Sequence, residues 1–231
     1  MLSVIFLGFL VGMQHATEAD HMAAVASLVT RSCSVRETAR QGLFWGVGHT
    51  LTLFLFGGLV LVMDSLVPQQ LSRILELAVG VMLVLLGVDV LRRLIRDRIH
   101  FHSHRHGKIR HFHAHSHHSG KPHNEDAHQH NHLSRLPLRS LLIGMTHGMA
   151  GSAALIVLAL ESVTSTTQGL LYIALFGAGS IFGMILLAMV ISLPLRYSAG
   201  TLTWAHNGLV ATVGLVTIGL GGHMIYQFGV L

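Results

Sequence analysis

The chain has 231 residues, of which 51% are hydrophobic and only 11% are Asp, Glu, Lys or Arg. Soluble domains carry about 25% charged residues, so this composition indicates an integral membrane protein. The formal net charge of +5 comes mainly from one segment between Arg92 and Arg139, so it gives no reason to expect nucleic acid as a partner.

The first apolar segment runs from residue 1 to 29 and contains the most unusual stretch of the chain, residues 12–21 (Gly-Met-Gln-His-Ala-Thr-Glu-Ala-Asp-His). It lacks a basic n-region and is too long for an h-region, so we expect a permanent helix rather than a cleaved signal peptide. A carboxylate at the centre of a membrane helix costs about 2.5 to 3.5 kcal/mol. Glu18 and Asp20 therefore need partners, and the stretch is a candidate functional site.

Helical geometry separates the ionisable groups of this stretch. At about 100° per residue, His15, Glu18 and His21 share an arc of about 120°, whereas Asp20 points about 140° away from His15. Either Asp20 holds an imidazole from outside the ligand shell, or the helix is locally unwound, as in many transporters. We favour unwinding that brings His15, Asp20 and His21 together, with Glu18 left open. The alternative is that these groups only join neighbouring helices as polar contacts.

Six stretches are long enough to cross a bilayer, which takes about 20 residues. They lie near 2–29, 42–66, 72–95, 138–160, 168–193 and 203–228. Arg and Lys follow the first, third and fifth stretches, which predicts that these loops are cytoplasmic and that both termini lie outside the cell membrane. The predicted fold class is therefore an all-α, multi-pass membrane protein with six transmembrane helices.

The two halves of the chain share a pattern. Residues 12–15 (Gly-Met-Gln-His) recur as 144–147 (Gly-Met-Thr-His), and 46–49 (Gly-Val-Gly-His) parallel 177–180 (Gly-Ala-Gly-Ser). Units with an odd number of helices insert in opposite orientations, which predicts two inverted three-helix repeats. Many of the glycines also fit close helix packing alone. The predicted domains are a first repeat at 1–99, a His-rich cytoplasmic loop at 100–136 and a second repeat at 137–231.

The loop between the third and fourth helices is rich in histidine, with 13 of the 33 residues from 100 to 132. Such a segment cannot build an apolar core, so we expect disorder without metal, and its imidazoles suit divalent metals. A merely solvated charged loop is the alternative. The predicted auxiliary metal ligands are His102, His104, His106, His111, His113, His115, His117 and His118.

Two further histidines are candidate ligands within the apolar segments. His49 follows Gly46 and Gly48, and small residues allow another backbone to approach closely. His147 occupies the position equivalent to His15 in the second half. The predicted membrane site thus comprises His15, Glu18, Asp20, His21, His49 and His147, while Asp89, His206 and His223 are weaker candidates.

Residues 15–21 resemble the His-x4-Asp-His signature of the nickel/cobalt transporter (NiCoT) family, and 46–50 resemble its second-helix glycine-histidine motif. Residues 144–152 are similar to UreH-type, urease-accessory relatives. The resemblance implies that His15, Asp20 and His21 form the metal site, with His49 assigned less firmly. Glu18 replaces the usual Asp and six helices replace eight, which favours the UreH-type branch or the six-helix nickel/cobalt efflux branch.

These patterns predict a secondary transporter that carries nickel, and also cobalt, with uptake favoured over efflux. No phosphate-binding loop is present, so ATP is not expected to drive it. No resident cofactor is expected, and the partners implied are the metal ion, the lipid membrane, and a cytoplasmic nickel chaperone or urease and hydrogenase maturation proteins. A membrane protein that senses or delivers metal without transporting it is an alternative. An intramembrane metalloenzyme is disfavoured because His-Glu-x-x-His is absent, so we expect no enzyme.

Overall fold

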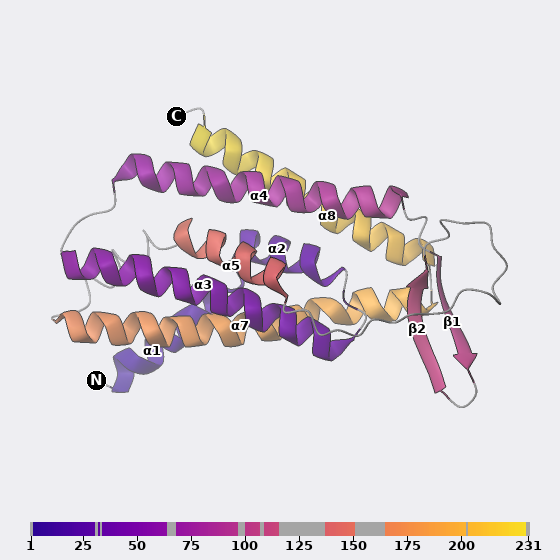
Figure 1. Cartoon of the computed structure of the whole chain (residues 1–231), viewed down its shortest axis with the longest axis horizontal. Helices are drawn as coiled ribbons and strands as arrows, with labels where there is room; N and C mark the ends of the chain where they lie inside the picture. Colours follow the sequence, from indigo (N-terminus) through magenta and orange to yellow (C-terminus); the bar gives the residue numbers. More distant parts are fainter. Residues whose placement is uncertain are drawn as a thin grey trace.

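The computed structural model describes residues 2–30, 32, 34–63, 68–96, 100–106, 109–115, 137–150, 165–201 and 203–229. Within these residues the protein is helical apart from one β-hairpin (Figure 1). The helices are α1 (Leu2–His15), α2 (Ala19–Val29), α3 (Val35–Met63), α4 (Gln69–Arg96), α5 (Leu138–Ala150), α7 (Thr166–Thr201) and α8 (Thr203–Gly229).

Four of these helices, α3, α4, α7 and α8, are long and apolar enough to cross a membrane. Large apolar side chains are exposed on their outer faces, as expected where lipid replaces water. Examples are Leu55, Leu59, Leu85, Val88, Val190, Leu193, Leu215 and Val216. The chain is therefore a helical membrane protein, as its composition predicts.

The first apolar segment is not one continuous helix from 2 to 29, because it is interrupted at residues 16–18, within the stretch where local unwinding was favoured. α1 ends at His15, and α2 begins at Ala19. Between them the backbone tightens, because the N–H groups of Thr17 and Glu18 donate to the carbonyls of Gln14 and His15 at 2.9 and 3.1 Å. Glu18 then adopts an extended conformation (φ −64°, ψ 150°) before α2 starts. The chain thus changes direction within the polar stretch.

The other predicted spans differ from the structure mainly at their ends. α3 begins at Val35 rather than near 42, since Ser34 accepts a hydrogen bond from the N–H of Glu37 and caps a polar first turn. α7 runs from Thr166 to Thr201 and contains Pro194. The predicted fourth span corresponds to α5 as far as residue 150, and the remainder to 160 lies outside the described residues.

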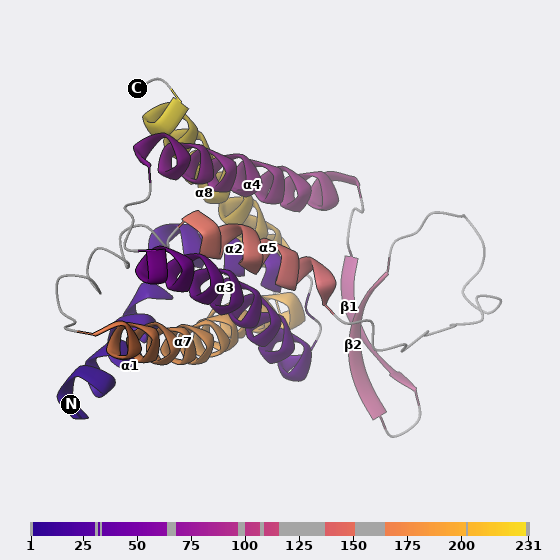
Figure 2. The same cartoon turned by 60° about the vertical axis from the view of Figure 1, so that its left-hand side comes forward.

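The helices pack in pairs, with α3 beside α7 and α4 beside α8 (Figures 1 and 2). α1 lies along α7 and α5 lies along α3. The short helix α2 contacts α3, α4, α7 and α8, so it lies inside the bundle, and seven of its residues are buried. A polar group on α2 can therefore find protein partners instead of lipid.

Glycines allow these helices to touch backbone to backbone. A β-carbon at Gly12 would overlap the carbonyl of Phe176 on α7, and a β-carbon at Gly144 would overlap the carbonyl of Trp45 on α3. The same kind of contact joins α4 to α8, through the pairs Gly80–Gly221 and Gly87–Gly214. At each of these crossings the glycine allows the close helix packing that the sequence predicted.

Part of the His-rich loop forms a hairpin, which corrects the expectation of disorder for that part. Strands β1 (His100–His106) and β2 (Ile109–His115) are antiparallel, and the register places histidine opposite histidine in the pairs His100–His115, His102–His113 and His104–His111. The physical reason lies in the sequence, where alternation with a two-residue period on both sides of a short Gly-Lys connection is typical of a hairpin. His117 and His118 lie outside the described residues.

Candidate metal site

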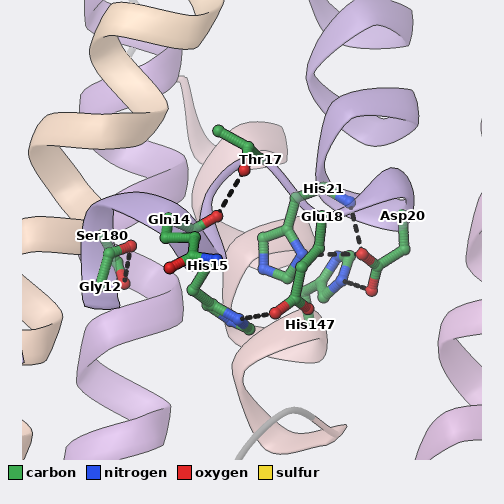
Figure 3. Close-up of polar contacts among 9 residues, drawn as sticks. All are labelled: Gly12, Gln14, His15, Thr17, Glu18, Asp20, His21, His147 and Ser180. Atoms are coloured by element: carbon green, nitrogen blue, oxygen red, sulfur yellow. Dashed lines mark hydrogen bonds and ion pairs between the residues drawn. The ribbon is translucent and has the colours of Figure 1, made fainter. Parts of the chain in front are cut away.

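Four buried histidines from four helices meet where the first segment breaks. His15 ends α1, His21 lies on α2, His49 on α3 and His147 on α5. The ring centroids of His21 lie 4.4 Å from His15, 5.2 Å from His49 and 4.1 Å from His147. The break turns α2 so that side chains from both sides of it face the same interior point (Figure 3).

His15 is held by the carboxylate next to it. Its Nδ1 lies 2.8 Å from Oε1 of Glu18, which is close enough for the ring N–H to donate to the carboxylate. Nε2 of His15 is buried and has no hydrogen-bond partner among the described residues. The Glu18 contact thus fixes the tautomer that leaves a lone pair on Nε2.

His21 repeats this arrangement with Asp20. Its Nδ1 lies 3.0 Å from Oδ1 of Asp20, and the same oxygen accepts the backbone N–H of His21 at 2.8 Å. Nε2 of His21 is again buried without a partner in the described part of the chain. A carboxylate behind an imidazole is the usual support of a metal-ligating histidine.

His49 supplies a third free imidazole. It is completely buried, and neither ring nitrogen has a hydrogen-bond partner among the residues described. The candidate ligand atoms of His15, His21 and His49 all lie within 4.8 Å of one another. Because metal–nitrogen bonds are about 2.0 to 2.1 Å long, only a small inward shift would place all three nitrogens around one ion. We call His15, His21 and His49 the three-histidine site.

Asp20 also reaches the second half of the chain. Its Oδ2 lies 2.8 Å from Nε2 of His147 on α5 (Figure 3). Asp20, His21 and His147 form a second group whose candidate ligand atoms lie within 4.8 Å of one another. Nδ1 of His147 is buried and without a partner in the described chain. His21 therefore belongs to both groups.

Two aromatic side chains enclose the cluster, and the sequence analysis missed both. The Trp45 ring lies 5.5 Å from His21 and 5.8 Å from His147, while Phe176 lies 5.2 Å from His15. A signal for them was present, because each directly precedes the Gly-x-Gly of its half. Their rings keep the imidazoles away from lipid and water.

The electrostatics of the break favour a cation. The carbonyl end of α1 carries a partial negative charge beside His15, and the amino end of α2 stabilises the carboxylate of Asp20 in its first turn. A third carboxylate, Glu76 on α4, is half-buried and close enough to Asp20 and His147 to interact with them electrostatically. A divalent ion would offset this concentration of negative charge.

The weaker candidates lie elsewhere. Asp89 pairs with Arg139 at 2.8 Å and with Arg93 at 3.5 Å, which makes it a link between α4 and α5. His206 is buried with its Nδ1 3.0 Å from the carbonyl of Leu195. His223 is exposed on α8. The six residues predicted as the membrane site, in contrast, lie in one cluster.

Fold and site together define a helical membrane protein with a histidine–carboxylate cluster at a broken helix. No family model and no solved structure matches the chain. It is 35% identical over 230 residues to the urease accessory protein UreH of Bacillus sp. (strain TB-90), and the alignment covers 100% of this chain and 93% of the relative. The chain belongs to the UreH family of urease accessory proteins, which confirms the UreH-type resemblance.

Proposed function

We propose that the protein is a secondary transporter that carries nickel, and also cobalt, through the three-histidine site. The observation that carries the proposal is the set of three buried imidazoles with free nitrogens, two of them backed by carboxylates. Imidazole nitrogen suits late first-row divalent metals such as nickel. The relative is named as an accessory protein of urease, and a supply of nickel for urease favours uptake over efflux.

Alternation between the two sides would come from an inverted repeat, with one unit at 1–99 and the other at 137–231. The contact of Gly12 with Phe176 and the contact of Gly144 with Trp45 support this, because they join equivalent positions of the two halves in exchanged roles. Rocking of one unit against the other would expose a central ion site to each side in turn. The His-rich loop at 100–136, on the cytoplasmic side, would collect ions beside the pathway and pass them to a nickel chaperone or to urease maturation proteins.

The first prediction tests the site directly. His15→Ala, Asp20→Ala, His21→Ala and His49→Ala should each reduce nickel flux into proteoliposomes by at least about tenfold, since each removes a ligand or its support. Removing an ionisable group lowers the cost of membrane insertion, so normal yield and monodispersity are expected. His223→Ala, on the exposed face of α8, is the matched control and should leave flux unchanged.

The possible results separate the alternatives. Wild-type flux in both His15→Ala and His21→Ala would refute the proposed site. Nickel binding without flux in the wild-type protein would identify a sensing or delivery protein instead. Flux that runs only from the cytoplasmic face outward, in vesicles of known orientation, would identify an efflux protein of the same architecture.

A further inference from the structure

We propose that Asp20, His21 and His147 form a second position for the transported ion, occupied in alternation with the three-histidine site. This inference rests on the proposed function. It assigns to His147 a direct role as ligand and to His21 the role of passing the ion from one position to the other. We call this group the hand-over position.

The three residues of the hand-over position offer carboxylate oxygen and imidazole nitrogen atoms, which are common ligands of divalent metals. Oδ1 of Asp20 is 3.0 Å from Nδ1 of His21, and Oδ2 is 2.8 Å from Nε2 of His147. Both histidines are only 1% exposed, so their ring nitrogens are shielded from bulk water. The two oxygens of one carboxylate and two imidazole nitrogens therefore converge in the hand-over position.

The two nitrogens of His21 serve different groups. Nδ1 faces Asp20, and Nε2 remains for His15 and His49. A neutral imidazole has one N–H and one lone pair, so it can bind an ion at only one nitrogen at a time. With the ion on Nε2, the proton stays on Nδ1 and is donated to Asp20. With the ion in the hand-over position, that proton lies on Nε2, and the proton of His147 lies on its Nδ1.

This exchange conserves protons and charge. Each imidazole has one proton before and after the exchange: one N–H bond breaks and the proton passes to water near the partly exposed Asp20, while water returns a proton to the other ring nitrogen. Asp20 is a carboxylate at the start and at the end, and the ion keeps its charge. Simultaneous occupancy would require His21 to lose its last proton and would place two divalent cations on opposite sides of one ring. The two positions are therefore alternatives, and one ion moves between them.

The origin of the ligands connects this exchange to the movement of the two halves. His15, His21 and His49 all belong to the first unit, whereas the hand-over position combines residues of both units. His147 is on α5, in the second unit, so a relative movement of the two units would change the distance between His147 and Asp20. Glu76 on α4 is a further carboxyl group in the electrostatic surroundings of Asp20 and His147. The geometry thus couples ion movement to the relative position of the units.

A purely structural role for His147, as a donor that holds Asp20 in place, makes a different prediction. His147→Gln in the full chain retains an N–H donor for Asp20 but removes the imidazole. If His147 is a ligand, nickel flux into proteoliposomes should fall by at least tenfold. If His147 only positions Asp20, flux should stay within twofold of the wild type, and that result would overturn the proposal.

A spectroscopic test detects the ion itself. Cys33 is the single cysteine, so in a Cys33→Ser background His147→Cys and His49→Cys each place one thiol in one of the two positions. Nickel bound to a thiolate gives a sulfur-to-metal charge-transfer band, which the histidines of the loop cannot produce. Ser140→Cys, a buried position two turns earlier on α5, is the matched control and should give no band.

The combined outcomes are decisive. Bands in both histidine-to-cysteine variants, together with loss of flux in His147→Gln, support two ion positions. A band for His49→Cys but none for His147→Cys overturns the hand-over position and leaves the proposed function intact. The absence of a band in both variants, with no nickel flux in the wild type, overturns the proposed function and this inference with it.

Discussion

At the scale of single residues, the cluster combines buried imidazoles with carboxylates that differ in exposure. The Glu18 side chain is 56% exposed, whereas that of His15 is 9% exposed. Asp20 is 26% exposed and contacts two imidazoles that are almost completely buried. The carboxylates thus lie on the outer side of the rings, where they orient nitrogen lone pairs toward the interior.

Glu18 offers a test of this orienting role. Glu18→Gln keeps an oxygen that can accept from His15 but removes the charge, so we expect the apparent KM for nickel flux to rise by about 10- to 100-fold, as for other groups behind a metal ligand. Flux at saturating nickel should change much less. Glu37→Gln, at the exposed start of α3, serves as the control. An unchanged KM in Glu18→Gln would show that the contact of Glu18 with His15 does not affect nickel binding.

The sequence predicted the members of this cluster better than their arrangement. His15, Asp20 and His21 could be recognised because ionisable groups are costly in an apolar segment. The pairing of Asp20 with His147 could not, since it depends on how α5 packs, 127 residues further along the chain. Trp45 and Phe176 each precede a Gly-x-Gly motif, but the sequence does not show that these two aromatic side chains contact the histidines.

At the scale of helices, backbone contact at glycine fixes where the site residues lie. Gly12 precedes His15 by one turn, and Gly144 precedes His147 by the same distance. Each glycine rests on the carbonyl of an aromatic residue that in turn covers the cluster. Helix packing and ligand placement are therefore set by the same few residues.

Alanine at Gly12 should disturb this packing. The new β-carbon would overlap the carbonyl of Phe176, and overpacking of this kind costs about 1 to 3 kcal/mol. We expect a lower melting temperature in detergent, together with reduced nickel flux. Gly219→Ala is the matched control, because nothing lies within 4 Å of a β-carbon built there. Equal stability of the two variants would contradict the close approach of α1 and α7.

The sequence predicted the break in the first helix, but it did not predict the start of α3 or the hairpin in the loop. In a straight helix the side chains of His15 and Asp20 would point about 140° apart, which favoured an unwound first helix. The structure has a break between these two residues. The early start of α3 was missed because its first two turns carry Arg36, Glu37 and Arg40, which lower the local hydropathy. The hairpin was missed because composition was given more weight than the alternating positions of histidine in the loop.

At the scale of the whole molecule, exposed aromatic residues indicate how the bundle lies in the membrane. Tyr197 and Trp204 are 78% and 76% exposed where α7 meets α8, and Tyr226 is 70% exposed near the far end of α8. Aromatic side chains with polar atoms concentrate at the two membrane–water interfaces. Their positions agree with α8 as a span between two interfaces.

Orientation can be tested with the native cysteine. Cys33 follows the first apolar segment beside Arg31, so the distribution of Arg and Lys predicts a cytoplasmic position for it. A membrane-impermeant maleimide should label it only after permeabilisation. Ser165→Cys in a Cys33→Ser background, at the exposed start of α7, should react in intact cells. The reverse labelling pattern would invert the orientation and place the His-rich loop outside.

The contact of Asp20 with His147 also constrains when the amino-terminal segment can finish folding in the membrane during synthesis. The ribosome adds about 5 to 20 residues per second, so roughly 6 to 25 seconds pass between the synthesis of these two residues. During that interval the carboxylate of Asp20 lacks the imidazole that it contacts in the finished bundle. We therefore expect the newborn amino-terminal segment to stay at the translocon or beside an insertase until α5 arrives. A chain truncated before α5 would be a target for membrane proteolysis.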